Sequence, residues 1–513
     1  MKNEFKPHIG KNVIETLTLG MYEDPRFIYR EYVQNAADQI DVAVEQEILK
    51  NRNEGSINIE IDNSKKSIKI EDNATGISSD KVRKFLGDVA NSEKDINKRK
   101  GFRGIGRLGG LGYCDKLIFE TSSKGENIKS IMILNAKLLR EIIGNIQDTR
   151  DASSVISVIT KITTQEETKD SHYFRVILEN VESNEIMNVD GVKKYLSMVA
   201  PVPFASDFLH LEKITSHFKS KNIIFDEYNV EVNTTKIFKA YKNVIHFEKG
   251  DKKDATITSI GFFDINDSNE KLLGVGWYGI SIKINFIIPE TNIERGIRIR
   301  KNNITIGNEK TLFERFKTER TNLRYIGEIH VISNNFIPNA RRDYFNLNKT
   351  LEQFQASLEV IFDNFESKLP HIASDLHNRL KNVKDSKNLI VAYKKDAVNF
   401  STTVEQEQRL QEVLKSVLNA NNAASKIEKI AAEANNNSTV KELYDSIIKD
   451  YDFKISEKEL EGIYSQRIYP PIKFKKVSAE QEIILNEVVI FLQDEMGHQA
   501  AAKLISKLQK KYN

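Results

Sequence analysis

The spacing of hydrophobic and polar residues predicts two helices within residues 10–50. In the second helix, one set of side chains recurs every three to four positions, the period that places residues on one face of an α-helix. This face combines apolar residues with one amide. Its members are Ile28, Tyr32, Asn35, Ala36 and Ile40.

Strand-like alternation follows the helices. Residues 56–62 and 66–71 alternate apolar and polar side chains around a turn, which predicts a β-hairpin. Ser78 or Ser79 is placed to cap a helix over residues 80–91. Helices with a mostly antiparallel sheet predict an α+β domain over residues 1–200. Further strands are expected near 116–121, 128–134, 154–161 and 173–180.

Two more regions follow this domain. Pro201 and Pro203 mark a boundary, after which strand-like and helical runs alternate and predict a second α+β domain over residues 201–348. Residues 349–513 have the pattern of a charged helical region, with 351–369 as the clearest amphipathic stretch. Within this region we expect an Asn/Ala-rich hinge or weakly held helix at 419–438 and a last helical segment at 478–511.

Composition and charge narrow the class of protein. The 513 residues are 40% hydrophobic and 29% charged, and the net charge of +3 gives no overall nucleic-acid signature. The single cysteine, Cys114, excludes an internal disulfide and fits a reducing cytoplasm, where we expect the protein to act. We expect no membrane span and no signal peptide, because no apolar run approaches roughly 18 residues and the first ten residues lack an apolar core.

Three polar residues share one face of the second predicted helix. Glu31 and Asn35 are four positions apart, and Asp38 follows on the same face. An amide oxygen suits Mg²⁺, a cation that prefers oxygen ligands, and a carboxylate can orient and deprotonate an attacking water. A solvated polar stripe on an ordinary helix is the alternative interpretation.

Asp72 is a second candidate, because it ends a strand and precedes the sequence Asn-Ala-Thr-Gly. Its carboxylate can accept a hydrogen bond from an exocyclic amine such as that of adenine. Gly76 allows the backbone to approach a ring closely or to turn sharply. The alternative is a plain turn, since Asp and Asn are common in turns.

The third candidate is the glycine-dense run GFRGIGRLGGLGY, residues 101–113. Such a run loses much conformational entropy on ordering, which suits a loop whose N–H groups wrap phosphates and which closes over a ligand. A flexible linker is the alternative, although apolar strand residues follow directly. The run contains no Walker-type GxxxxGK[ST] motif. Its glycines are Gly101, Gly104, Gly106, Gly109, Gly110 and Gly112.

In order and spacing, the three motifs resemble those of the Bergerat-fold ATPases, a superfamily that includes gyrase, the ninety-kilodalton heat-shock chaperones, histidine kinases and MutL. The resemblance covers residues 25–125 and points to the chaperone-like and MORC-like branch. The stretch LGDVANSEK, residues 86–94, also resembles the chaperones. The resemblance implies an α/β-sandwich ATPase domain that binds ATP and Mg²⁺.

The resemblance also assigns roles to residues. Glu31 corresponds to the general base, Asn35 to the Mg²⁺ ligand and Asp38 to a nearby nucleotide contact. Asp72 and Gly76 correspond to the adenine site. The glycines Gly104, Gly106, Gly109, Gly110 and Gly112 correspond to a lid.

Departures from the family pattern concern the turn and the lid. Ala74 stands where the second motif normally has glycine, and the lid spacing differs from that of the chaperones. The threonine that usually completes adenine recognition has two candidates, Thr121 and Thr163.

The second predicted domain contains two motifs that also resemble this family. Residues 336–345, FIPNARRDYF, resemble the chaperone middle-domain loop that sends an arginine to the γ-phosphate. The match makes Arg342 that residue, with Arg341 as the fallback, and a solvated basic loop as the alternative. Residues 295–307 resemble a strand pair of chaperone-like and MORC-like transducer domains, in which Lys301 could reach the phosphate as in MutL.

The leading hypothesis is an Mg²⁺-dependent ATPase that acts as a chaperone-like clamp, in which the helical C-terminal region holds a homodimer together around a protein client. The main alternative is a MORC-like or MutL-like nucleic-acid clamp in DNA maintenance or defence, with lysine runs at 473–476 and 503–511 as phosphate contacts. A histidine kinase and a type II topoisomerase fit the domain order less well. A non-hydrolysing, ATP-gated interaction module is a further class.

Overall fold

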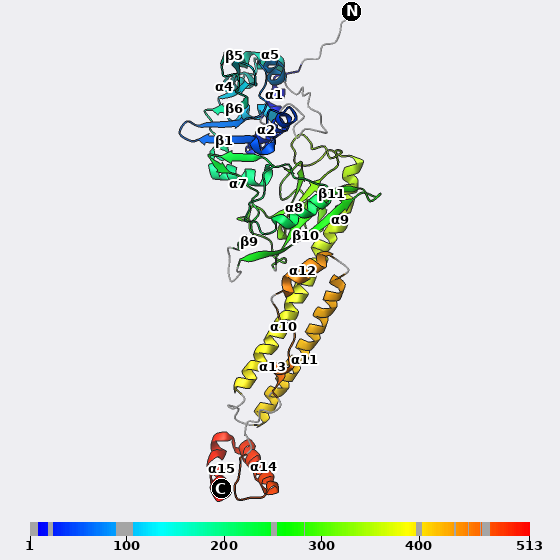
Figure 1. The fold of residues 1–513 in the computed structure, drawn as a ribbon. Helices are drawn as coiled ribbons and strands as arrows, with labels where there is room; N and C mark the ends of the chain where they lie inside the picture. The colour runs from blue at the N-terminus through cyan, green and yellow to red at the C-terminus, as the bar shows by residue number, and fades with distance from the viewer. Residues whose placement is uncertain are drawn as a thin grey trace, which may run out of the picture. The chain divides into compact units, whose positions relative to one another are not determined.

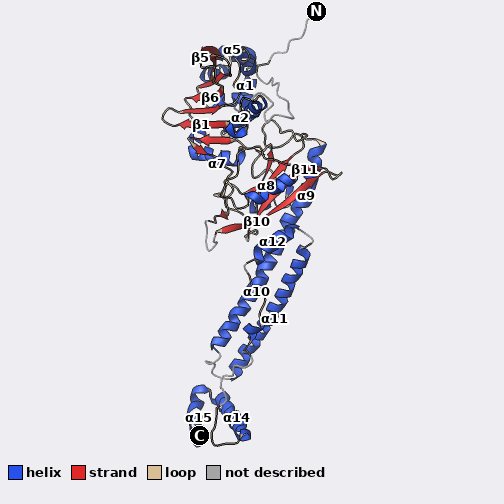
Figure 2. Ribbon diagram, in the orientation of Figure 1, coloured by secondary structure: helices blue, strands red, loops and turns tan. Residues whose placement is uncertain are grey.

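The computed structural model describes residues 9–18, 24–88, 106–247, 254–281, 283–396, 403–435, 438–449, 451–461, 463 and 472–512. The chain divides into two compact units, Met1–Glu366 and Ser367–Asn513. The first contains two β-sheets with their helices, and the described residues of the second are helical or in loops (Figures 1 and 2). The predicted α+β class with a helical C-terminal region is confirmed.

The first sheet has eight strands in the order β5-β4-β3-β6-β2-β1-β7-β8. Neighbouring strands are antiparallel except β1 and β7, which are parallel. Side chains of β1 and β2 alternate between buried and more exposed, so one face of the sheet forms the core. The strands are β1 (Ser56–Asp62), β2 (Ser67–Asp72), β3 (Lys116–Ser122), β4 (Ile128–Asn135), β5 (Thr160–Glu166), β6 (Tyr173–Glu179), β7 (Asn229–Val232) and β8 (Thr235–Lys236).

Helices share one hydrophobic core with this sheet, and α2 is the most deeply buried of them. The predicted hairpin of residues 56–71 is confirmed as β1 and β2. The sheet also continues past residue 200, where the first domain was expected to end, because β7 pairs with β1. The helices are α1 (Asn12–Thr18), α2 (Phe27–Glu45), α3 (Val82–Gly87), α4 (Ala136–Gly144), α5 (Ala152–Ile159), α6 (Asn184–Met187) and α7 (Val189–Val199), with 3₁₀ turns η1 (Arg52–Glu54) and η2 (Gly106–Gly112).

Two local predictions are wrong. The apolar run near 154–161 is mainly helix α5, because the Asp151 side chain caps Ser154 N–H and Val155 and Ile159, four residues apart, face the core. Helix α3 begins without a serine cap. Ser79 instead donates its N–H to the Glu126 carboxylate. Residues 89–91 of the expected helix lie outside the described residues.

The second sheet has six strands in the order β13-β12-β14-β11-β10-β9, and β12 and β14 are its parallel pair. Both faces are covered: Trp277 packs with Phe204 on one side, and Tyr278 packs with Phe365 on the other. The strands are β9 (Val244–Ile245), β10 (Ala255–Asn266), β11 (Leu272–Ser281), β12 (Gly296–Lys301), β13 (Ile304–Ile306) and β14 (Ile326–Val331). The helical segments are α8 (Leu211–Ser220), α9 (Lys349–Asp363), η3 (Phe313–Arg315) and η4 (Glu319–Arg324).

The second unit contains a long helix pair, α10 and α11, that lie side by side (Figure 1). The Asn/Ala-rich segment is helical as far as Ala434, and Ala420 and Ala423 are buried in it, so it is no hinge there. No described helix is long and apolar enough to cross a membrane. After the π-helical turn η5 (Asn364–Lys368), the helices are α10 (Leu369–Asp396), α11 (Thr403–Ala434), α12 (Ser438–Ile448), α13 (Glu457–Leu460), α14 (Ala479–Met496) and α15 (His498–Tyr512).

Candidate functional site

The polar residues of α2 point into the protein. Glu31 is 7% exposed and Asp38 is fully buried, while Asn35 is half-buried. A solvated stripe would leave these side chains in water, so that interpretation of the helix is excluded. Burial of several polar groups on one helix face is costly unless they are paired or bind a ligand, which makes this face a candidate site.

Gln34 adds a polar group that the sequence interpretation missed. Its side chain is 1% exposed, and neither atom of its amide has a hydrogen-bond partner among the described residues. An amide buried in this way costs about 1–3 kcal/mol. Gln34 lies three residues after Glu31, a helical spacing that was readable from the sequence but drew no attention beside the charged residues.

Asp72 and Gly76 lie where β2 leaves the sheet. The Asp72 carboxylate is buried and accepts the N–H of Ala74 at 3.1 Å, so alanine in place of the family glycine fits this turn. Gly76 has a φ of +63°, and a Cβ there would lie 1.9 Å from the carbonyl oxygen of Ser122. The glycine is therefore required by the neighbouring backbone of β3.

Strand register places a third side chain beside Asp72. Asp72 is opposite Phe174 on β6, and Phe174 is opposite Thr121 on β3, so the three share one face of the sheet. The hydroxyl of Thr121 donates to Tyr173 O at 2.9 Å and accepts from Ile77 N–H at 2.8 Å. Thr121 therefore belongs to this row of residues.

The other threonine candidate, Thr163, is exposed on the edge strand β5. Phe174 was missed because its position beside Asp72 depends on pairing between segments about a hundred residues apart. The row of Asp72, Phe174 and Thr121 combines a carboxylate acceptor with an aromatic ring, which are the groups that an adenine ring needs from a protein.

The described part of the glycine run packs directly on α2. A Cβ on Gly106 would lie 2.2 Å from Oε2 of Glu31, and one on Gly109 would lie 2.8 Å from the ring of Phe27. These glycines permit the close approach of η2 to the helix. Gly101 and Gly104 lie outside the described residues, and so does most of the stretch 86–94.

Tyr32 of α2 forms hydrogen bonds with η2. Its hydroxyl donates to Arg107 O at 2.9 Å and accepts the N–H of Gly110 at 3.2 Å. A Cβ on Gly110 would lie 2.7 Å from this hydroxyl. Gly112 ends η2 and is half-buried. Close packing is thus one reason for these glycines, and their role as a lid stays a prediction.

An arginine of the second domain reaches the candidate base. Nε of Arg342 lies 2.9 Å from Oε1 of Glu31, and both side chains are buried. Arg342 has a φ of +58°, a left-handed conformation that is costly for a non-glycine residue and that tends to occur at functional positions. Nε of Arg30 lies 4.0 Å from the same carboxylate oxygen.

Arg341 and Lys301 are placed differently from Arg342. Arg341 is exposed, and its backbone carbonyl accepts a hydrogen bond from Arg30 at 3.3 Å. The amine of Lys301 donates to the carbonyl of Phe336, at the base of the loop that carries Arg342, and burial lowers the pKa of this amine to about 8. The structure thus brings Arg342 to Glu31 and places Lys301 under the loop.

Comparison with known proteins identifies the class of this domain. Residues 31–173 match the family model described as "Histidine kinase-, DNA gyrase B-, and HSP90-like ATPase". The matched residues therefore form a domain of the Bergerat-fold ATPase superfamily, with distant similarity to heat-shock chaperones.

Two relatives are both named chaperone protein HtpG. The one from Wigglesworthia glossinidia brevipalpis is 30% identical over 146 residues, which cover 25% of this chain and 23% of the relative. The one from Fusobacterium nucleatum subsp. nucleatum is 25% identical over 130 residues, or 22% of this chain and 21% of the relative. The chain thus spans less than a quarter of the length of these relatives.

Proposed function

We propose that this protein binds ATP with Mg²⁺ and hydrolyses it at a site shared by α2 and the Arg342 loop. The contact between Arg342 and Glu31 carries the proposal. It joins a carboxylate near the first sheet to an arginine about three hundred residues later, and this supports a single site built from the two sequence motifs.

The residues present fit this chemistry. Asp72 and the ring of Phe174 would hold the adenine, and the oxygen of Asn35 would bind Mg²⁺, which supplies positive charge to the phosphates when it is bound. Glu31 would take a proton from the attacking water. Arg342, which lies beside Glu31, would bring a positive charge to the phosphates, where negative charge develops during phosphoryl transfer.

Two substitutions test the assignment. Glu31→Ala should retain ATP binding but lose roughly 10²–10⁴-fold in turnover, because it removes the general base. Asp72→Asn should abolish ATP binding, measured by titration calorimetry. Glu71→Gln is the matched control, since Glu71 lies on the opposite face of β2 and pairs with Arg175. Turnover at the wild-type rate in Glu31→Ala would refute the assignment.

We infer further that two copies of the chain form a clamp around a macromolecular client, as a chaperone-like cycle requires. Support comes from α14, where Ile484, Val488 and Phe491 are exposed at a helical spacing. Within one chain the acidic helix α14 already packs against the lysine-rich helix α15. The exposed apolar row of α14 is therefore the surface that a second copy would cover. Light scattering that shows monomers with and without a non-hydrolysable ATP analogue would contradict this.

A nucleic-acid clamp is the second candidate function. The two lysine runs lie in one small folded region, because Lys476 N–H donates to Tyr512 O at 3.0 Å and Phe474 packs against the Tyr512 ring. A salt-sensitive stimulation of ATP turnover by DNA would favour this candidate over a protein client.

A further inference from the structure

The hairpin of β12 and β13 contacts both parts of the proposed site. Its turn residues, Asn302 and Asn303, have φ angles of 50° and 59°. Two consecutive positive φ values define the tight two-residue turn that keeps paired strands in register, and asparagine tolerates that conformation. The hairpin is therefore a rigid element whose side chains have fixed directions.

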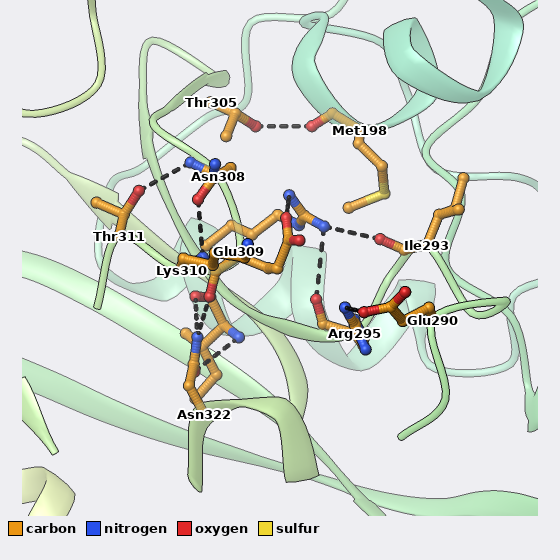
Figure 3. Close-up of polar contacts among 12 residues, drawn as sticks. Met198, Glu290, Ile293, Arg295, Thr305, Asn308, Glu309, Lys310, Thr311 and Asn322 are labelled. Atoms are coloured by element: carbon orange, nitrogen blue, oxygen red, sulfur yellow. Dashed lines mark hydrogen bonds and ion pairs between the residues drawn. The ribbon is translucent and has the colours of Figure 1, made fainter. Parts of the chain in front are cut away.

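Arg300 and Thr305 of the hairpin hold the end of α7. Arg300 is fully buried and donates to the carbonyls of Met198 at 2.8 Å and Ala200 at 3.3 Å. The hydroxyl of Thr305 donates to the same Met198 carbonyl at 2.6 Å (Figure 3). The last carbonyls of a helix have no partner within the helix and favour a cation, so these two side chains cap α7.

A second polar path runs from the turn to α2. Asn303 donates its side-chain N–H to the carbonyl of Asp226 at 2.7 Å. The Asp226 carboxylate pairs with Arg52 at 2.7 Å, and Arg52 pairs with Asp41 at 2.6 Å. Asp41 lies on α2, three residues after Asp38, so this path ends on the helix that carries Glu31.

The other side of the hairpin holds the loop of Arg342. Lys301 follows Arg300 on β12, so its side chain points to the opposite face of the strand, where its amine binds the Phe336 carbonyl. Directly after β13, the N–H of Gly307 donates to the carbonyl of Arg342 at 2.8 Å. The loop is thus fixed to the hairpin at its base and at Arg342 itself.

We propose that residues 296–307 act as a bracket that sets Arg342 against Glu31, with Arg300 as its main positioning residue and Lys301 as a support of the loop. This inference rests on the proposed ATPase function. It explains why adjacent residues of one strand are both cationic: one fixes the bracket to α7, and the other fixes the loop to the bracket. Lys301 therefore acts through Arg342, by holding its loop.

The test is Arg300→Met in the full chain. We expect turnover to fall roughly 10- to 100-fold, because a misplacement of about 1 Å in a catalytic group has that effect, while the Kd for ATP stays within about twofold. Combining it with Arg342→Ala should give no further loss beyond Arg342→Ala alone.

The matched control is Arg298→Met. Arg298 is a buried arginine on the same face of β12, but its partners are Ile293 O at 2.8 Å, Arg295 O and the Glu309 carboxylate. These three partners, labelled in Figure 3, all lie in residues 293–309. Arg298→Met should not lower turnover relative to ATP binding. Thr305→Val removes only one hydroxyl from the cap and should give a smaller loss of turnover in the same direction. If Arg300→Met does not fold, Thr305→Val takes its place as the test of the bracket.

Hydrogen exchange without nucleotide separates this inference from the proposed function. Arg300→Met should speed amide exchange at Gly307 and in the loop 336–345, and Arg298→Met should not. These two results would support the bracket even if the wild-type protein hydrolysed no ATP. Unchanged exchange in the loop, or turnover losses of Arg300→Met and Arg342→Ala that multiply, would overturn it.

Discussion

Two buried carboxylates, Glu31 and Glu328, are each paired with an arginine but in different surroundings. Glu328 contacts Arg300, the amine of Lys239 at 2.7 Å and Nε2 of His330 at 2.9 Å, all in the second domain. Glu31 contacts Arg342, a loop residue that itself has a left-handed backbone conformation. Glu328 sits in a network whose groups pair with one another, whereas Glu31 is contacted by a loop from a distant part of the sequence.

This difference distinguishes a carboxylate that stabilises the fold from one in a cluster that can bind a ligand. A buried polar network with every member satisfied fixes a unique packing. Around Glu31, the nearby amide of Gln34 has no partner among the described residues, so this cluster retains the capacity to bind a ligand. Two buried glutamates with the same kind of partner are thus distinguished by the completeness of their surroundings.

The electrostatics of the Glu328 cluster agree with a structural role. Burial alone would raise the pKa of Glu328, but the charges of Arg300 and Lys239 hold it well below its usual value. Burial lowers the pKa of Lys239 to about 7 and that of His330 to about 4. The histidine is therefore neutral near pH 7 and adds no further positive charge to the cluster.

The largest difference expected between Glu328 and Glu31 is in their contribution to the stability of the fold. Glu328→Ala should lower the free energy of unfolding by roughly 3–5 kcal/mol, because it leaves two buried cations without their carboxylate. Urea unfolding followed by the fluorescence of Trp277, which is buried in the second domain, measures it. Glu179→Ala, which breaks an exposed pair with Lys116, is the control and should cost no more than about 1 kcal/mol. If Glu31→Ala lowered the free energy of unfolding as much as Glu328→Ala, the two carboxylates would contribute equally to stability and the comparison would be contradicted.

A smaller effect is expected from acid. The pKa of His330 is about 6.5 in the unfolded chain and about 4 in the folded one, so between these values the unfolded state binds more protons. The part of the stability that depends on neutral His330 should therefore be complete above pH 6.5 and be lost as the pH drops toward 4, by up to roughly 3 kcal/mol. His330→Asn should lack this part of the loss. Identical acid dependence of the two proteins would show that His330 does not titrate in this way.

Local motifs could be predicted from the sequence because they depend on neighbours along the chain. The helical spacing of Glu31, Asn35 and Asp38 and the strand end at Asp72 are of this kind, and the structure buries or half-buries all four. The strand expected near residue 155 is wrong because Val155 and Ile159 favour strands by composition but are spaced to bury one helix face.

Features that depend on tertiary pairing could not be predicted. Phe174 lies beside Asp72 only through the register of β2 and β6. The family match favoured Arg342 over Arg341, but the physical reason lies in the loop backbone, which turns one side chain to Glu31 and leaves the other exposed. Without that match, adjacent residues of the same type offer no local signal for the choice.

The most direct test of the shared site is a double-mutant cycle on turnover with Glu31→Gln and Arg342→Met. If the carboxylate and the arginine act as one unit, the double variant should hydrolyse ATP no more slowly than the slower single variant. Losses that multiply, with ATP binding intact in all three variants, would show that the two residues act independently and would contradict the account.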